Sequence, residues 1–198
     1  MYKIAITGKA NTGKNTLSRM LVRQLRLAKS QRYMSAKYIA FADPIKEMIR
    51  EMFPTIPKKY LYGSSKFRSE IIPGAFKNGQ PLTIRQLLID LGTEVGRNYK
   101  PSVWLDNFDY RFEQVKYNKI VIVTDVRFRN EFEHLRNKGF FQIKLYRNTG
   151  APGSTHVSET NQDSIQDNEF DYVLHNDYSL RDLKVEVANH VIPKLYDI

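Results

Sequence analysis

The stretch IAITGKANTGKNTL, residues 4–17, decides the fold of this chain. An apolar run over 2–7 ends at a glycine, as a buried parallel strand would, and leucines near helical spacing predict a helix over 14–28. Between them, the pattern G-x4-G-K at 8–14 has the spacing of a phosphate-binding loop, where backbone N–H groups and a helix N-terminus converge on an anion. This spacing arises by chance in roughly one chain in twenty of this length, and the flanking strand and helix make coincidence several-fold rarer. The sequence therefore predicts a phosphate site in this loop.

The residue after the loop lysine is unusual. That position normally offers Mg²⁺ a hydroxyl ligand, but here it is Asn15, whose amide oxygen could bind Mg²⁺ directly or through water. Lys14 would reach the β- and γ-phosphates, and Thr16 could hydrogen-bond the α-phosphate. A GTPase or motor that cycles around a tightly held Mg²⁺ is an odd host for this substitution, whereas a kinase whose Mg²⁺ is held mainly by phosphates and water tolerates it. Asn15 therefore favours phosphoryl transfer to a small molecule.

Strands and helices alternate along the rest of the chain. Further strands are expected at 37–41, 119–124, 140–146 and 170–175. Helices are expected at 43–53 with Asp43 as N-cap, at 83–98 with a capping box at Thr83, at 102–117 and 129–139, and from Ser179 onward. Strands separated by helices form parallel βαβ units, so the pattern predicts a three-layer α/β fold with a central parallel sheet flanked by helices.

The chain is expected to form a single domain, 1–198, with two irregular parts. Residues 54–82 hold four prolines, three glycines and no clear period, which is typical of an insertion. The polar stretch 147–169 is expected to be a short lid-like loop, because loops over phosphoryl-transfer sites exclude water.

Composition limits the partners and the compartment. The 198 residues carry a net charge of +10, which favours anionic partners, but the basic residues are dispersed rather than gathered in a run, so nucleic acid is not expected. Cysteine is absent, which excludes disulfides and thiolate metal sites and fits a reducing compartment. The first strand is expected to begin at Tyr2, so no signal peptide is expected, and no apolar run approaches the roughly 20 residues that span a membrane. These features favour a cytoplasmic protein with no membrane partner.

The chain resembles the deoxynucleoside monophosphate kinases of tailed bacteriophages, a branch of the P-loop nucleoside-monophosphate kinase superfamily. The resemblance rests on the order and spacing of six segments: GKANTGKNT (8–16), FADPIKE (41–47), LTIRQLLIDLGTEVGR (82–97) with Trp104 downstream, TDVRFRNE (124–131), STHVSE (154–159) and NDYSL (176–180). It implies a P-loop NTPase fold with an inserted acceptor-binding lobe over about 54–104. It also implies transfer of the terminal phosphate of ATP, with Mg²⁺ as cofactor, to a deoxynucleoside monophosphate in the host cytoplasm. The partners would be small-molecule nucleotides, and a homodimer is one option for the oligomeric state.

The resemblance also implies roles for individual residues. Catalysis would fall to Lys14, Asp125 and Arg127. The residues expected to bind ATP are Asn11, Gly13, Lys14, Asn15, Thr16, Arg147 and Asn176. Those expected to bind the acceptor are Ile45, Lys46, Arg68, Arg85, Trp104, Asp125, Arg127 and Glu131, and Arg129 is a further candidate. Taken as a residue alone, Arg97 could clamp a phosphate or pair with Glu94 or Asp90.

Taken as residues alone, most of these positions keep a second, structural interpretation. Lys46 and Arg68 could be ordinary surface cations, and Trp104 could be a core residue, as single tryptophans usually are. Glu131 could pair with Arg127 at i,i+4, and Asn176 could belong to an ordinary turn.

The scarcity of candidate bases fits this chemistry. An acceptor phosphate oxygen is already ionised near neutral pH, so catalysis reduces to aligning two anions and offsetting their charge. Two other classes stay open. One is a related kinase that acts on dephospho-coenzyme A, phosphomevalonate or a ribonucleotide. The other is a DNA-associated ATPase, which typically needs a second acidic residue beside Asp125 that this sequence lacks.

Overall fold

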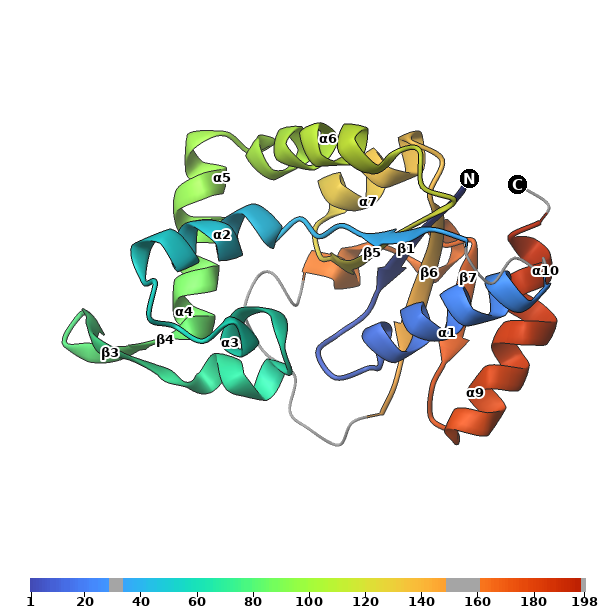
Figure 1. The fold of residues 1–198 in the computed structure, drawn as a ribbon, viewed down its shortest axis with the longest axis horizontal. Coiled ribbons are helices and arrows are strands. Elements are labelled where there is room, and N and C mark those ends of the chain that lie inside the picture. Colours follow the sequence, from blue (N-terminus) through green and yellow to red (C-terminus); the bar gives the residue numbers. More distant parts are fainter. Residues whose placement is uncertain (29–33, 149–160, 197–198) are drawn as a thin grey trace. The chain divides into compact units, whose positions relative to one another are not determined.

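The computed structural model describes residues 1–28, 34–148 and 161–196 (Figure 1). The chain separates into two compact units, unit 1 with Met1–Ala40 and Asp109–Ile198, and unit 2 with Phe41–Phe108. Within the described residues, no helix combines the length and the apolar character that a membrane span requires.

Unit 1 is built on a five-stranded sheet in which every pair of neighbours is parallel, as predicted. The strand order is β2-β5-β1-β6-β7, and most residues of the three inner strands are buried, as a sheet covered on both faces requires. In chain order the strands are β1 (Tyr2–Thr7), β2 (Ala36–Tyr38), β5 (Ile120–Val126), β6 (Phe141–Tyr146) and β7 (Tyr172–His175).

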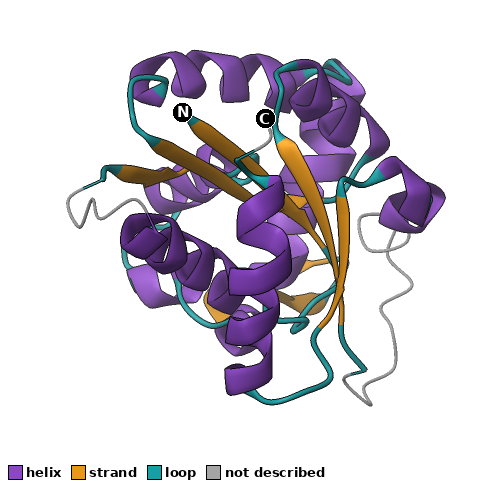
Figure 2. Ribbon diagram, turned by 90° about the vertical axis from the view of Figure 1, so that its right-hand side faces the viewer, coloured by secondary structure: helices purple, strands orange, loops and turns teal. Residues whose placement is uncertain are grey.

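Helices lie on both sides of this sheet, which completes the three layers (Figure 2). Leu17, Leu21 and Leu25 recur every four residues along α1 (Lys14–Ala28), so one stripe of that helix is buried in a core shared with β1, β5 and β6. The same core includes residues of the C-terminal helices α9 (Leu180–Glu186), η5 (Val187–Val191) and α10 (Ile192–Lys194). The remaining helical elements of unit 1 are α7 (Arg129–Asn137), η3 (Asn161–Ser164), η4 (Asp167–Glu169) and the last part of α6 (Val103–Val115).

The connections reverse direction at the centre of the sheet. From β1 the chain passes through α1 to β2, on the far side of β5, whereas from β5 it passes through α7 to β6, on the far side of β1. Adjacent strands β1 and β5 therefore send their following loops in opposite directions. Open α/β sheets bind ligands at such a switch point, outside the carboxyl ends of the strands.

Unit 2 is a helical unit with one hairpin. Its core includes Ile45, Ile49, Leu61 and Trp104, and Phe41 stacks on Phe108 with ring centroids 4.8 Å apart. Its elements are α2 (Asp43–Met52), α3 (Lys58–Tyr62), η1 (Ser65–Ser69), β3 (Ile71–Lys77), β4 (Gln80–Thr83), α4 (Ile84–Ile89), η2 (Asp90–Val95), α5 (Gly96–Tyr99) and the start of α6.

Three local expectations were wrong. Asp43 is not the N-cap of α2, because Ala42 holds that position and the Asp43 carboxylate pairs with Lys46 instead. The strand expected over 37–41 pairs only as far as Tyr38. Residues 54–82 are not irregular, since they contain α3, η1 and most of the β3–β4 hairpin.

The helix expected over 83–98 begins as predicted, with the Thr83 hydroxyl accepting the N–H of Gln86 at 3.2 Å. It does not continue as one α-helix, because a π-helical turn replaces the α-helix at η2. At this turn the indole N–H of Trp104 donates to the carbonyl of Gly92 at 2.7 Å, and the N–H of Gly96 donates to the carbonyl of Leu91, five residues back.

Candidate active site

The loop between β1 and α1, expected to bind phosphate, makes a sharp turn into the helix. Asn11 and Gly13 have positive φ values of 64° and 102°, which turn the chain sharply before the helix. The carbonyl of Gly13 accepts the N–H groups of Thr16 and Leu17, both at 2.9 Å, and so begins the hydrogen-bond ladder of α1. The first N–H groups of a helix have no acceptor within the helix and carry its positive dipole end, so this turn can bind an anion.

Two glycines in the loop cannot be replaced without displacing neighbours. A Cβ on Gly8 would lie 2.5 Å from the carbonyl oxygen of Leu145 in β6. A Cβ on Gly13 would lie 2.6 Å from Nδ2 of Asn176, the amide that donates to the carbonyl of Thr12 at 2.8 Å. The glycines therefore allow the loop to pack directly on the ends of β6 and β7.

Asn176 is mainly a support for this loop in the structure. The residue is only 6% exposed, and its backbone N–H donates to the backbone carbonyl of Tyr146 at 2.8 Å. The next residue, Asp177, accepts the N–H of Asn148 at 2.7 Å, beside the exposed Arg147 at the end of β6. The expected contacts of Asn176 and Arg147 with ATP stay predictions.

Lys14 lies folded over its own loop. Its ammonium donates to the carbonyls of Gly8, at 2.5 Å, and of Lys9, at 2.7 Å. Asn15 is exposed and Thr16 is half-buried in the same first turn of α1. All three side chains therefore belong to the short segment where a nucleotide phosphate is expected.

Asp125 and Arg127 lie at the end of β5, next to the strand that leads into the loop. The β1–β5 pairing shifts between Ala5–Val123 and Thr7–Val126, which leaves an extra residue on β5 beside Asp125. A bulge of this kind re-aims side chains and is frequent beside active sites. β5 extends through Val126, so Asp125 is the next-to-last residue of the strand rather than the first residue after it.

Glu131 shapes the turn that carries Arg127. It is only 3% exposed, and its Oε2 accepts the backbone N–H groups of Arg127 at 2.8 Å and of Phe128 at 3.1 Å. A carboxylate at the start of α7 also interacts favourably with the positive end of the helix dipole. Glu131 thus positions the neighbouring backbone, and its expected contact with the acceptor stays a prediction.

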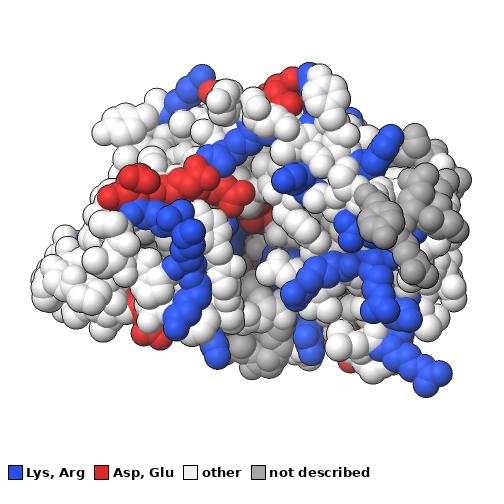
Figure 3. Space-filling view, viewed as in Figure 1, with Lys and Arg blue, Asp and Glu red and all other residues white. Residues whose placement is uncertain are grey.

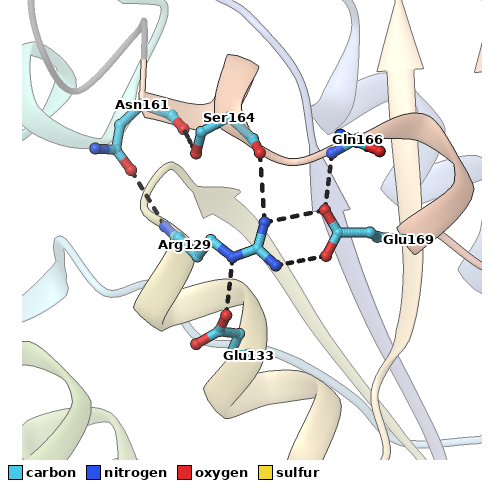
Figure 4. Close-up of polar contacts among 6 residues, drawn as sticks. All are labelled: Arg129, Glu133, Asn161, Ser164, Gln166 and Glu169. Carbon is cyan, nitrogen blue, oxygen red and sulfur yellow. Dashed lines mark hydrogen bonds and ion pairs between the residues drawn. The ribbon is translucent and has the colours of Figure 1, made fainter.

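Arg129 is committed to structural contacts (Figure 4). Its guanidinium forms a two-pronged pair with Glu169, at 3.0 and 2.6 Å, and its Nε donates to Glu133 at 2.8 Å. The Arg129 hydrogen bonds lower the pKa of Glu169 below its usual value. This arrangement ties α7 to the segment around η4.

A second cluster fastens that segment to β6. Lys144, with a side chain only 9% exposed, pairs with Asp167 at 2.8 Å and donates to the carbonyl of Ile165 at 2.9 Å. Tyr146 donates to the same Asp167 at 2.7 Å. Hydrogen bonds from Lys144 and then Tyr146 lower the pKa of Asp167.

The expected acceptor residues of unit 2 differ in exposure. Ile45 is buried and lies so close to Gly92 that a Cβ there would come within 2.9 Å of its Cδ1. Lys46 pairs with Asp43 at 3.1 Å and lies over the ring of Tyr62, 5.2 Å from its centroid. Arg68 in η1 is half-buried, whereas Arg85 is exposed in the first turn of α4.

Trp104 is a core residue of unit 2. It is 7% exposed, its N–H is bonded to Gly92, and its ring lies where a Cβ on Gly96 would clash at 2.3 Å. The structural interpretation of this tryptophan is therefore the one that the geometry favours, and stacking on an acceptor base stays a prediction.

Comparison with known proteins decides the family. The family described as "Deoxynucleotide monophosphate kinase" matches residues 58–187, which is more than half of the chain. This chain belongs to the deoxynucleotide monophosphate kinase family. The matched region includes Asp125 and Arg127, while the phosphate loop lies before it.

Single relatives of the kinase were also found. A protein of Acanthamoeba polyphaga mimivirus named "Putative deoxynucleotide monophosphate kinase" is 26% identical over 203 residues, covering 96% of each chain. The crystal structure of TT1252 from Thermus thermophilus aligns with 98% of both chains, at a TM-score of 0.47 and 15% sequence identity.

Several supporting residues of the kinase were missed by the sequence analysis. Asn161, Asp163 and Lys144 contact residues that are 20 or more positions away along the chain. No local motif marks them, because their role depends on the return of the chain to the end of the sheet. Residues 149–160 of the expected lid-like loop, 147–169, lie outside the described residues, as does the STHVSE segment, whereas 161–169 contain η3 and η4.

Proposed function

We propose that this kinase transfers the γ-phosphate of ATP to a deoxynucleoside 5′-monophosphate and releases the diphosphate for DNA precursor synthesis. The observation that carries the proposal is the G-x4-G-K loop at the sheet switch point, beside Asp125 and Arg127, in a member of the deoxynucleotide monophosphate kinase family. The family supports a nucleotide kinase, and the loop supports a nucleoside triphosphate as the donor.

The charges of the donor site suit phosphoryl transfer. The attacking oxygen of a nucleoside monophosphate is already ionised, so no general base is needed. Lys14 and Arg127 would offset the charge that develops on the transferred phosphoryl group, and Asp125 would orient the acceptor or Mg²⁺-bound water. The backbone of Arg127 is preorganised for this role, because its N–H donates to the carboxylate of Glu131.

The residues present fit a Mg²⁺ ion that is carried mainly by nucleotide phosphates. When bound, Mg²⁺ would supply positive charge that offsets the charge of the phosphates. Asn15 offers an amide oxygen in the first turn of α1, and Asp125 could hold a Mg²⁺-bound water. In the part of the chain that the structure describes, no group of three or more His, Cys, Asp or Glu side chains could hold a metal, which fits an ion with few protein ligands.

The acceptor specificity belongs to the proposal as well. Lys46, Arg68 and Arg85 are the cations of unit 2 expected to hold the acceptor phosphate, and Ile45 is expected to line that site. Other phosphorylated acceptors, including ribonucleotides, dephospho-coenzyme A and phosphomevalonate, are the competing substrates. Nucleic acid and membranes are not expected partners.

An ATP-consumption assay across acceptors tests the proposal. The purified protein is assayed with ATP and Mg²⁺ and with each deoxynucleoside monophosphate, each ribonucleotide, dephospho-coenzyme A, phosphomevalonate and duplex DNA in turn. We expect turnover to require a deoxynucleoside monophosphate. Turnover with dephospho-coenzyme A alone, or with DNA alone, would overturn the proposal.

Lys14→Ala provides the matched test of mechanism. Removing one preorganised cation from a phosphoryl-transfer site should lower kcat by at least about 100-fold. The fold should be retained, as checked by circular dichroism. Lys37→Ala is the control, since Lys37 is an exposed lysine on the edge strand β2 and its loss should leave kcat unchanged. Near-normal turnover of Lys14→Ala would show that the loop does not serve this reaction.

A further inference from the structure

η3 contacts both loops of the donor site. Asp163 pairs with the ammonium of Lys9, in the phosphate loop, at 3.0 Å. Asn161 accepts the backbone N–H of Arg129, at the turn after β5, at 3.3 Å through Oδ1 (Figure 4). A single turn of 3-10 helix, distant in sequence from both loops, therefore links them.

This turn is itself held firmly. Gln162 and Ile165 are buried, at 3% and 0% exposure, and the hydroxyl of Ser164 donates to the carbonyl of Asn161 at 2.7 Å. The carbonyl of Ser164 accepts from the guanidinium of Arg129 at 3.3 Å. Because both its apolar and its polar groups make contacts, η3 has a fixed position and can in turn fix the position of the loops that it contacts.

The contact from Asn161 is one of three hydrogen bonds that hold consecutive backbone N–H groups in the turn after β5. Three consecutive backbone N–H groups, at Arg127, Phe128 and Arg129, each donate to a side-chain oxygen, the first two to Glu131 and the third to Asn161. A backbone held at three successive positions sets the direction in which the side chain of Arg127 leaves the chain. Alignment of charged groups with the reacting phosphates governs the rate of phosphoryl transfer.

Stability alone does not account for the contact between η3 and the phosphate loop. The Lys9 and Asp163 side chains are 54% and 51% exposed, and exposed pairs of this kind contribute little to the free energy of folding. Their position is more informative, because the carbonyl of Lys9 also accepts the ammonium of Lys14. The pair thus connects η3 to the residue whose backbone holds the loop lysine.

We infer that η3 is a positioning element for phosphoryl transfer, in which Asn161 and Asp163 hold the turn carrying Arg127 in register with the phosphate loop. The inference rests on the proposed function. Neither residue is expected to touch a nucleotide, so both act through Arg129 and Lys9.

Two substitutions at Asn161 separate positioning from folding. Asn161→Leu removes the acceptor at similar size, and Asn161→Asp keeps an oxygen acceptor at the same place. We expect kcat of Asn161→Leu to fall about 10-fold, while its KM for ATP changes by less than about twofold, because misalignment affects the chemical step more than binding. Asn161→Asp should keep kcat within about twofold of the wild type.

Hydrogen exchange of the Arg129 amide tests the contact with Asn161 by a measurement that does not depend on enzyme activity. In Asn161→Leu the N–H of Arg129 should exchange with solvent faster than in the wild type and in Asn161→Asp. Glu133→Gln is the control, because it weakens the pair between Arg129 and Glu133 without touching η3, and both kcat and exchange should be unchanged. Unchanged kcat and unchanged exchange in Asn161→Leu would refute the inference, as would equal loss of kcat in Asn161→Leu and Asn161→Asp.

Asp163→Asn covers the case in which Asn161→Leu fails to fold. Asp163 is half exposed, so this variant should keep the wild-type melting temperature and lose about two- to threefold in kcat. Wild-type kcat in Asp163→Asn would contradict the role of the Lys9 contact. The proposed function has a separate point of failure, because a wild-type protein without acceptor-dependent turnover would refute it whatever the exchange results.

Discussion

At Gly13 two constraints meet in one residue. The backbone has φ of 102°, which L side chains rarely adopt, and the space where a Cβ would project is filled by the amide of Asn176. Gly74 in the β3–β4 hairpin shares the first constraint, with φ of 73°, but nothing lies within 4 Å of the corresponding Cβ position. Comparing Gly13 with Gly74 therefore separates the cost of backbone strain from the cost of close packing.

We predict that Gly13→Ala destabilises the protein more than Gly74→Ala. Backbone strain alone should cost about 1–2 kcal/mol at either position. At Gly13 the displaced hydrogen bond from Asn176 to Thr12 adds about 1–3 kcal/mol, and affinity for ATP should fall as well. Urea unfolding and calorimetric titration with ATP measure the two effects. Equal destabilisation by the two substitutions would contradict the close contact at Gly13.

The role of Trp104 could not be predicted from the residue type alone. The sequence contains one tryptophan, and its two interpretations, core residue or base-stacking surface, differ only in what surrounds the ring. In the structure the indole lies where a Cβ on Gly96 would project, and its N–H donates to the carbonyl of Gly92. Both glycines lie in the same predicted helix, yet that helix alone does not indicate which side chain will fill the space.

At the scale of elements, strong local signals were reliable. β1 and α1 have the bounds that the apolar run and the leucine spacing predicted, and Ser179 caps α9 by accepting the N–H of Asp182 at 3.3 Å. The β3–β4 hairpin was missed although its signal was present. Asn78 and Gly79 both have positive φ, as the favoured two-residue hairpin turn requires, and Asn-Gly is its strongest sequence mark.

The segment around η4 should make stability depend on acidic pH. Asp167 and Glu169 have lowered pKa values in the folded protein, so the stability that they contribute is complete above the usual carboxyl range, near pH 4. It is lost as the pH falls from there through the lowered values. We predict that Asp167→Asn reduces the unfolding free energy at pH 7 but has a smaller effect at pH 3, as measured by urea unfolding at both pH values. A difference that is the same at pH 7 and pH 3 would show that the Asp167 charge is not involved.

At the scale of the whole molecule, an acceptor-binding insertion was expected over about 54–104, and one of the two compact units, unit 2, spans 41–108. Its ends are joined by Phe41 and Phe108, which stack although 67 positions separate them (108 − 41). Aromatic residues at such a distance carry no local mark of their pairing, so the sequence could indicate the unit but not its limits.

The positive charge of the molecule is widely distributed. On the face shown in Figure 3, some Lys and Arg side chains adjoin one another, as at the lower right of the view, and others stand apart among uncharged and acidic side chains. Binding to nucleic acid through charge alone weakens steeply with salt.

We therefore predict that duplex DNA binds only at low salt and leaves ATP consumption unchanged at about 150 mM salt. Fluorescence anisotropy with labelled DNA and the ATP-consumption assay measure the two properties. DNA-stimulated ATP consumption at that salt concentration would mean that the net charge of +10 serves a polynucleotide rather than small nucleotides.

The folded-back position of Lys14 has an energetic consequence for any triphosphate that reaches the loop. Its ammonium already has two oxygen acceptors, supplied by the carbonyls of Gly8 and Lys9. The ammonium has three N–H donors, so a phosphate that engages all of them must replace these two carbonyls rather than bind a bare cation. The net gain is the difference between a charged and a neutral acceptor, which makes the lysine discriminate by the charge of its ligand: a triphosphate can displace the carbonyls, and an uncharged molecule of the same shape cannot.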